Sequence, residues 1–90
     1  MHRSDAEEQF AVWAEVTRRA TDEQVAGPAS LAAFAAWLCG DGVVASHAVD
    51  RVDAVAPGHP LATLVRSLLD HAVPPSIWDH IDAGYPTATT

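Results

Sequence analysis

The side chains of this sequence best suited to metal binding or acid–base chemistry are five histidines: His2, His47, His59, His71 and His80. Neutral imidazoles bind transition metals and titrate near neutral pH. Two of them directly follow an aspartate, in Asp70-His71 and Asp79-His80. Adjacent residues of a helix point about 100° apart, so neither aspartate can easily orient its neighbouring imidazole. We therefore favour a solvated surface for the histidines over a catalytic or metal-binding role.

One histidine shares a helix face with an arginine, because His47 and Arg51 are four residues apart. Together with Asp50 they could line a polar site. The same arrangement is typical of an exposed helix face, which is the interpretation we favour.

The remaining patterns do not indicate a nucleophile or a phosphate site. Gly40-Asp41-Gly42 lacks the preceding strand and the lysine of a phosphate loop, and is typical of a turn between helices. None of the serines lies in a motif that resembles an activated nucleophile. Cys39 is the only cysteine, and its apolar surroundings predict a small core residue in a reducing compartment. We therefore predict no enzymatic activity, no metal or cofactor, and no small-molecule ligand.

Length and charge restrict the class of protein further. The chain has 90 residues, 49% of them apolar, which is enough for one domain with one core. Its net charge of −7 repels phosphate backbones and anionic lipid, so nucleic acid and membranes are disfavoured as partners. No signal-peptide pattern precedes the domain, and the longest apolar run is about half of a membrane span. We expect a cytoplasmic protein.

Apolar residues recur at helical spacing along most of the chain, and no strand-like alternation persists. Ser4 or Asp5 can cap a first helix whose buried face holds Phe10 and Trp13. A second helix over residues 29–39, opened by Gly27-Pro28, is nearly all alanine. It must be enclosed by neighbours or expose an apolar stripe.

Three further helices complete the expected fold. The third covers residues 43–56, and six of its residues are expected to face inward: Val44, Ala45, Ala48, Val49, Val52 and Val55. The fourth opens at Pro60 and ends at Pro74-Pro75, with a leucine-rich apolar stripe: Leu61, Leu64, Val65, Leu68 and Leu69. A short last helix covers residues 76–83. We predict one helical domain over residues 1–84 and a flexible tail over residues 85–90.

The second and third helices resemble the second half of a tetratricopeptide repeat. Gly40-Asp41 forms the turn, Ala45 and Val52 take the small and apolar positions of the following helix, and Pro57 ends it. Ala33 supplies the small position on the preceding helix. Ala29 and Ala36 depart from the pattern, because the repeat usually has large aromatic side chains there.

A wider resemblance covers most of the chain. The residues that carry it are Val12-Trp13, Arg18-Arg19, the stretch 31–42, Asp50-Arg51, Pro57, Leu61-Ala62 and Val73-Pro74-Pro75 through Trp78. Together they resemble the C-terminal region of the actinobacterial domain-of-unknown-function family 4192. The resemblance implies a helical fold and carries no catalytic residues over to this chain.

These observations predict an all-α fold, a small bundle of four to five short helices with a central tetratricopeptide-like helical hairpin. The surplus of apolar side chains favours a non-enzymatic protein-interaction or assembly module, acting on a protein partner or by self-association. The residues expected to contact the partner are Phe34, Trp37, Leu38 and Trp78. Two alternatives remain: a structural cap or docking piece of a larger protein, and a metal-binding or enzymatic role through His47, His71 or His80.

Overall fold

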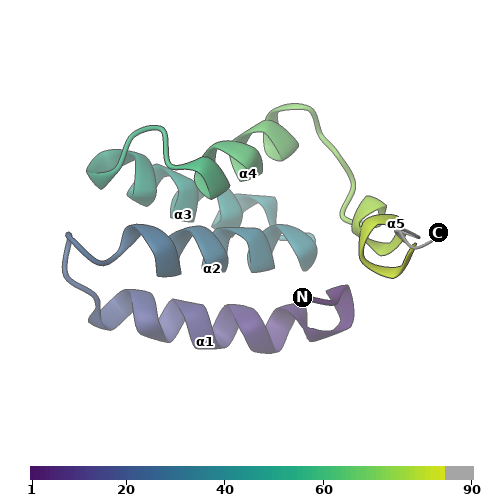
Figure 1. Ribbon diagram of the computed structural model, residues 1–90, viewed down its shortest axis with the longest axis horizontal. Coiled ribbons are helices and arrows are strands. Elements are labelled where there is room, and N and C mark those ends of the chain that lie inside the picture. Colours follow the sequence, from purple (N-terminus) through teal and green to yellow (C-terminus); the bar gives the residue numbers. More distant parts are fainter. Residues whose placement is uncertain (85–90) are drawn as a thin grey trace.

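A computed structural model describes the backbone of residues 1–84 and the side chains of residues 1–81. Its elements are one short 3-10 helix and five α-helices: η1 (Arg3–Asp5), α1 (Ala6–Arg19), α2 (Ala26–Leu38), α3 (Gly42–Val55), α4 (Pro60–Asp70) and α5 (Ile77–Gly84) (Figure 1). Because these residues contain helices and no strand, the all-α prediction is confirmed. The predicted tail over residues 85–90 lies outside the described residues. None of the helices described is long and apolar enough to cross a membrane.

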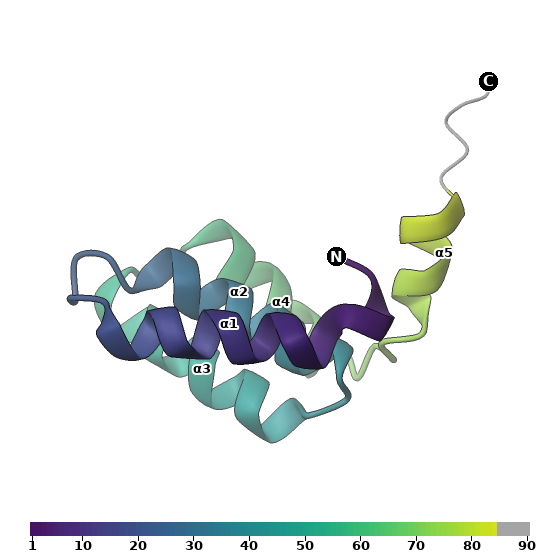
Figure 2. The same cartoon turned by 90° about the horizontal axis from the view of Figure 1, so that it is seen from below.

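The alanine-rich helix α2 lies at the centre of the bundle, with α1, α3 and α4 packed around it (Figures 1 and 2). Every residue from position 32 to position 38 is buried. Alanine side chains allow helix backbones to approach closely, so three neighbours fit around one short helix. Of the two outcomes expected for this helix, enclosure is the one observed.

The turn between α2 and α3 is fixed by hydrogen bonds at both helix ends. Gly40, at a φ of +82°, donates its N–H to Trp37 O, and Asp41 donates its N–H to Ala36 O. This pair of bonds is the Schellman motif, which favours glycine at the left-handed position. The Asp41 carboxylate then caps α3 by accepting the Val44 N–H at 3.0 Å. Ala33, Ala45 and Val52 are fully buried along the hairpin that results.

Helix α4 buries the expected apolar stripe with one exception, Leu64. Ala62 and Val65 are fully buried, whereas Leu64 is 50% exposed. At about 100° per residue, Ala62, Val65 and Leu69 point in nearly the same direction and Leu64 points away from it. Leu61, Leu68 and Leu69 are partly buried against the core. The predicted stripe is therefore wrong only for Leu64, and it did not include the fully buried Ala62.

Two other burial predictions were also wrong. Cys39 is exposed, because α2 ends at Leu38 and Cys39 caps its C-terminus. Val55 is exposed as well, at the last residue of α3. The end of α4 also falls earlier than predicted, at Asp70 instead of Pro74-Pro75.

The two ends of the described chain meet at Trp78 on α5. The Trp78 indole N–H donates to the Met1 carbonyl, and its ring lies edge-on to Phe34, with 5.1 Å between ring centroids. Arg3 forms an ion pair with Asp79 at 3.2 Å. These contacts attach η1 and α5 to each other and to α2.

Candidate functional site

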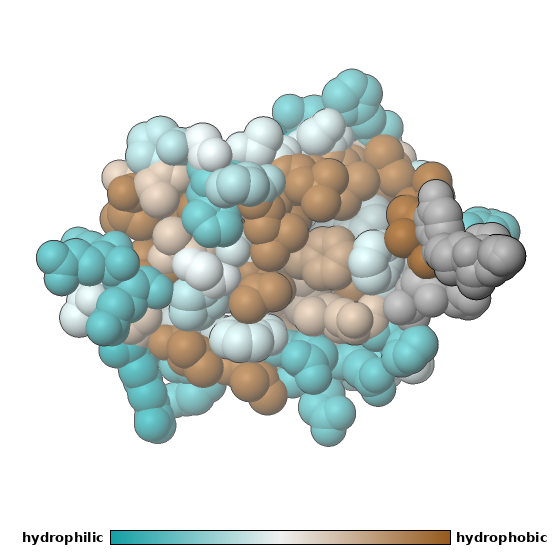
Figure 3. All heavy atoms as spheres, in the orientation of Figure 1, coloured by the Kyte–Doolittle hydropathy of each residue, from teal (hydrophilic) through white to brown (hydrophobic). Residues whose placement is uncertain are grey.

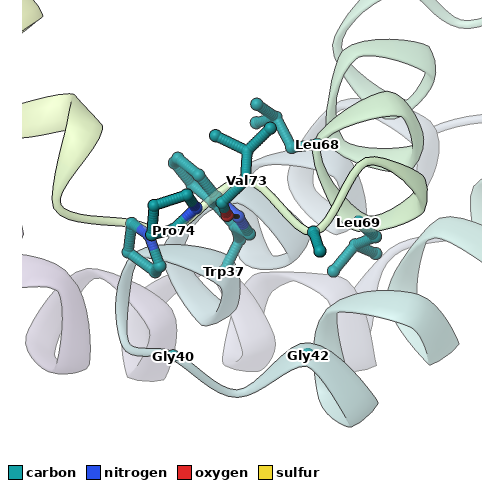
Figure 4. Close-up of a pocket in the computed structure, with 9 residues that line it drawn as sticks. Trp37, Gly40, Gly42, Leu68, Leu69, Val73 and Pro74 are labelled. Carbon is teal, nitrogen blue, oxygen red and sulfur yellow. Dashed lines mark hydrogen bonds between the residues drawn. The ribbon is translucent and has the colours of Figure 1, made fainter.

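The four residues predicted to contact a partner come together in space, but three of them belong to the core. Phe34, Trp37 and Leu38 are 9%, 4% and 2% exposed, and Trp78 is half-buried. Phe34 stacks on Trp37 at a centroid distance of 5.8 Å. The structure therefore places these three side chains mainly in the core, with Trp37 also lining the hollow of Figure 4, and their contact with a partner stays a prediction.

Four of the histidines lie in different surroundings. His59 Nδ1 accepts the Ala62 N–H at 3.5 Å and caps α4, and His71 Nδ1 lies 2.9 Å from Ser67 O. His80 lines an open depression beside Pro74, and His47 lies on α3. Within residues 1–81, no group of three or more histidine, cysteine, aspartate or glutamate side chains could hold a metal ion.

A groove runs between α1 and α3, both of which pack against α2 (Figures 1 and 2). We call it the α1–α3 groove, and its volume is about 270 Å³. Its ten lining residues come from three helices: Phe10, Ala14, Thr17 and Arg18 of α1, Ala29 and Ala32 of α2, and Val44, His47, Ala48 and Arg51 of α3.

Small side chains create this groove. Ala29 and Ala32 form part of the α2 surface beneath it, and Ala14 and Ala48 lie on its two flanking helices. A larger residue at Ala29 would occupy part of the space. The hollow therefore exists because α1 and α3 both pack against α2 at positions where the side chains are too short to meet one another.

The polar groups of the groove include two arginines and one histidine. The Thr17 hydroxyl donates to the Trp13 carbonyl at 2.7 Å, which leaves Arg18, His47 and Arg51 as the groups that can bind a ligand. Arg18 forms an ion pair with Glu15, which also pairs with Arg19 at 2.7 Å. Within the described part of the chain, neither His47 nor Arg51 has a hydrogen-bond or ion-pair partner.

The carboxylates of α3 are engaged elsewhere. Asp50 forms an ion pair with Arg66 of α4, and Asp53 lies 3.7 Å from the same guanidinium. The polar set suggested by the sequence is thus divided: His47 and Arg51 line the groove as a pair, and Asp50 belongs to the contact between α3 and α4. The groove is a local cationic region on a chain whose net charge is −7.

A second hollow, also of about 270 Å³, lies where α2 ends and the segment after α4 crosses it (Figure 4). Trp37, Leu68, Val73 and Pro74 are among its lining residues. Among the described residues that line this hollow, Trp37 is the one whose side chain can form a hydrogen bond. Its indole N–H donates to the Val73 carbonyl at 3.2 Å. With that group engaged, the hollow offers little to orient a ligand, and the α1–α3 groove is the better candidate site.

Sequence reasoning did not predict this groove. The spacing of four put His47 and Arg51 on one helix face, but that face was interpreted as solvated surface, and Ala29 was noted only as a departure from the repeat pattern. The contribution of α1 was missed, because it depends on how α1 packs against α2, and no local pattern specifies that.

Comparison with known proteins gives one family. The model of the family described as "Domain of unknown function (DUF4192)" matches residues 1–76, which include α1 to α4. No curated protein matches the chain, and no solved structure matches it.

Proposed function

The chain belongs to the DUF4192 family, and we propose that it is a non-enzymatic protein-interaction domain that binds its partner in the α1–α3 groove. One observation carries the proposal: an apolar hollow is bordered by two polar side chains, His47 and Arg51, that have no partner within the described residues. An apolar centre with a polar rim is the usual anatomy of a protein–protein interface.

The size of the groove supports a protein partner over a small molecule. Its 270 Å³ lies just below the roughly 300–1,000 Å³ typical of small-molecule sites, and is suited to one or two anchoring side chains. Its described lining contains no carboxylate and no thiol, and its one hydroxyl is engaged by backbone. His47 is the kind of group that acid–base catalysis uses, but no side chain of the described residues hydrogen-bonds to it to orient it, so a binding role is favoured.

Site-specific photo-crosslinking in the native cell tests the proposal. Ala14 and Ala48 flank the groove on facing helices and are half-buried, so each can be replaced in turn by a photoreactive amino acid. Ala11 and Ala54 are exposed residues of the same two helices outside the groove, and they serve as matched control positions. We expect both groove positions to crosslink to the same protein, which mass spectrometry identifies. The two control positions should form much less of that crosslinked product.

Two outcomes would contradict the proposed function. If positions 11 and 54 capture the same protein as strongly as positions 14 and 48, the contact is not specific to the groove. If neither groove position gives an adduct while the variants are folded by circular dichroism, the groove does not contact a protein in the cell.

A second candidate, a docking piece of a larger protein, is favoured by the apolar surface of α4 and α5. Ile77 and Ile81 are four residues apart on α5 and about half exposed, as is Leu64 on α4. Figure 3 shows apolar side chains gathered over α4 and continuing toward α5. Such a face would be covered in a larger assembly, and this candidate predicts marginal stability of the chain alone.

A further inference from the structure

We infer that the element recognised by the α1–α3 groove is an amphipathic helix of the partner, with carboxylates beside its apolar face. This inference rests on the proposed function and deepens it, because it specifies the chemistry of the partner. It follows from three properties of the groove: the helical structure of its walls, the spacing of the polar groups on its rim and the charge of its surroundings.

The walls of the groove favour a helical ligand over an extended one. Both are flanks of α-helices, whose backbone N–H and C=O groups are bonded within each helix. An extended peptide placed between them would find no backbone partners for its own N–H and C=O groups, and burying these unpaired is costly. A helix satisfies its backbone internally and can insert apolar side chains between the walls.

The floor of the groove fits the apolar face of such a helix. Alanines at positions 29 and 32 of α2 leave room for larger side chains, and Phe10 and Val44 extend the apolar surface on either side. An amphipathic helix presents apolar residues at intervals of three and four, so one or two of them can enter the hollow. The lining spans residues 10–18 of α1 and 44–51 of α3, about 12 Å along each wall, which accommodates about two turns of helix.

Two polar groups of the rim repeat at helical spacing, and both can donate a hydrogen bond to a carboxylate. His47 and Arg51 are one turn apart on α3, about 6 Å along its axis. Acidic residues three or four positions apart on a bound helix repeat at the same distance. Carboxylates also match the flat fork of an arginine, which binds them through two parallel hydrogen bonds.

The surrounding charge makes this recognition selective. The chain carries seven more acidic than basic side chains, so acidic partners are repelled by its surface as a whole. In the groove the sign is reversed, because Arg66 holds Asp50 and Asp53 on the α4 side of α3 and leaves Arg51 uncompensated. A nucleic acid strand would meet the same repulsion with no apolar side chain to place in the hollow. An acidic helix with an apolar face is the ligand that uses both features of the site.

An unbiased selection of peptides tests the inference. The full 90-residue chain is used to select binders from a displayed library of random 16-residue peptides, and the enriched sequences are synthesised and titrated. We expect apolar residues at intervals of three and four with acidic residues beside them, and helix formation on binding. Arg51→Gln should weaken binding roughly tenfold, and less at high salt. Arg19→Gln is the matched control, because Arg19 is an exposed arginine outside the groove lining, and it should change little.

The selection separates failure of the inference from failure of the proposed function. If the selected peptides lose binding to Ala14→Leu, which fills the groove, but contain no acidic pattern or ignore Arg51→Gln, the acidic helix is wrong and the groove remains a protein-binding site. If no selected peptide is sensitive to Ala14→Leu, with the variant folded and Ala11→Leu as control, both proposals fail.

Discussion

Cys39 ends α2 in surroundings that lower the reactivity of its thiol. The residue as a whole is exposed, yet partial burial of the thiol raises its pKa above the ordinary value of 9.0, and the carboxylates of Glu7 and Asp41 raise it further. Thiolate is the reactive form, so less of it is present at any pH near neutrality. The sequence suggested an inert cysteine for a different reason, burial in the core, which the structure does not support.

We predict that Cys39 reacts with iodoacetamide at pH 8 severalfold more slowly than the same cysteine in the urea-unfolded chain. Glu7→Gln removes one charge that raises the pKa, so it should speed the reaction, whereas Glu8→Gln, its neighbour in the first turn of α1, should not. Because the folded state holds this proton more tightly, the stability due to the thiol is present below pH 9 and decreases above it. Equal rates for folded and unfolded chains would contradict the raised pKa.

Ala72 follows the end of α4 in a conformation that suits glycine. Its φ is +52°, and it donates its N–H to Leu69 O while Val73 donates to Leu68 O, which is the Schellman pattern seen at Gly40. The left-handed conformation of an alanine destabilises the folded state by roughly 1 kcal/mol. Glycine removes this strain, but part of the gain is offset because glycine also makes the unfolded chain more flexible. We predict that Ala72→Gly raises the free energy of unfolding by about 0.5–1 kcal/mol in urea titrations.

The control for this prediction is the same substitution inside a helix. Ala54→Gly, at an exposed position of α3, should lower the free energy of unfolding by roughly 1 kcal/mol. If both substitutions destabilise the chain equally, the left-handed conformation at Ala72 is not the source of the difference.

At the scale of elements, the two indoles that meet Phe34 have different roles. Trp37 is buried in α2 and bonded to the segment that follows α4, so it supports several elements at once. Trp78 is half-buried and attaches α5, together with an exposed ion pair between Arg3 and Asp79. Exposed pairs contribute about 0–1 kcal/mol, so the attachment of α5 depends mainly on Trp78.

We predict that Trp37→Ala lowers the free energy of unfolding by about 3–5 kcal/mol, enough to unfold much of the chain. Trp78→Ala should instead release α5 and leave α1 to α4 folded. Hydrogen exchange followed by mass spectrometry distinguishes these results, because only the second variant should lose protection in α5 while α2 stays protected. Loss of protection throughout the chain in Trp78→Ala would show that α5 is part of the same cooperative unit.

The elements themselves were largely predictable from the sequence, and their contacts were not. Helical periodicity, Pro60 and the Gly40-Asp41 turn placed five helices close to their observed positions, because these signals are local. The same signals could not tell whether α2 is enclosed or exposed, since that depends on how many neighbours pack against it. Both the burial of Phe34 and Trp37 and the existence of the α1–α3 groove follow from that nonlocal arrangement.

At the scale of the whole molecule, charge and exposed apolar surface have opposite effects on self-association. Seven large apolar residues are exposed within the described chain, and they are distributed over four helices: Val12, Val16, Val43, Val55, Leu64, Ile77 and Ile81. A stable dimer buries roughly 800 Å² per partner as one continuous surface, which side chains scattered in this way supply poorly. The net charge of −7 adds repulsion between copies.

We predict that the purified chain is a monomer over a hundredfold range of concentration, measured by light scattering after size exclusion in about 150 mM salt. A monomer at every concentration would agree with a surface that binds a different protein, as we propose for the α1–α3 groove.

A dimer that persists at the lowest concentration would show that the apolar side chains of α4 and α5 serve self-association. Ile77→Ser with Ile81→Ser should then restore the monomer, and Val12→Ser with Val16→Ser on α1 should not. If the dimer instead forms only when salt is raised to about 1 M, where charges are screened within roughly 3 Å, repulsion is what keeps the chain monomeric.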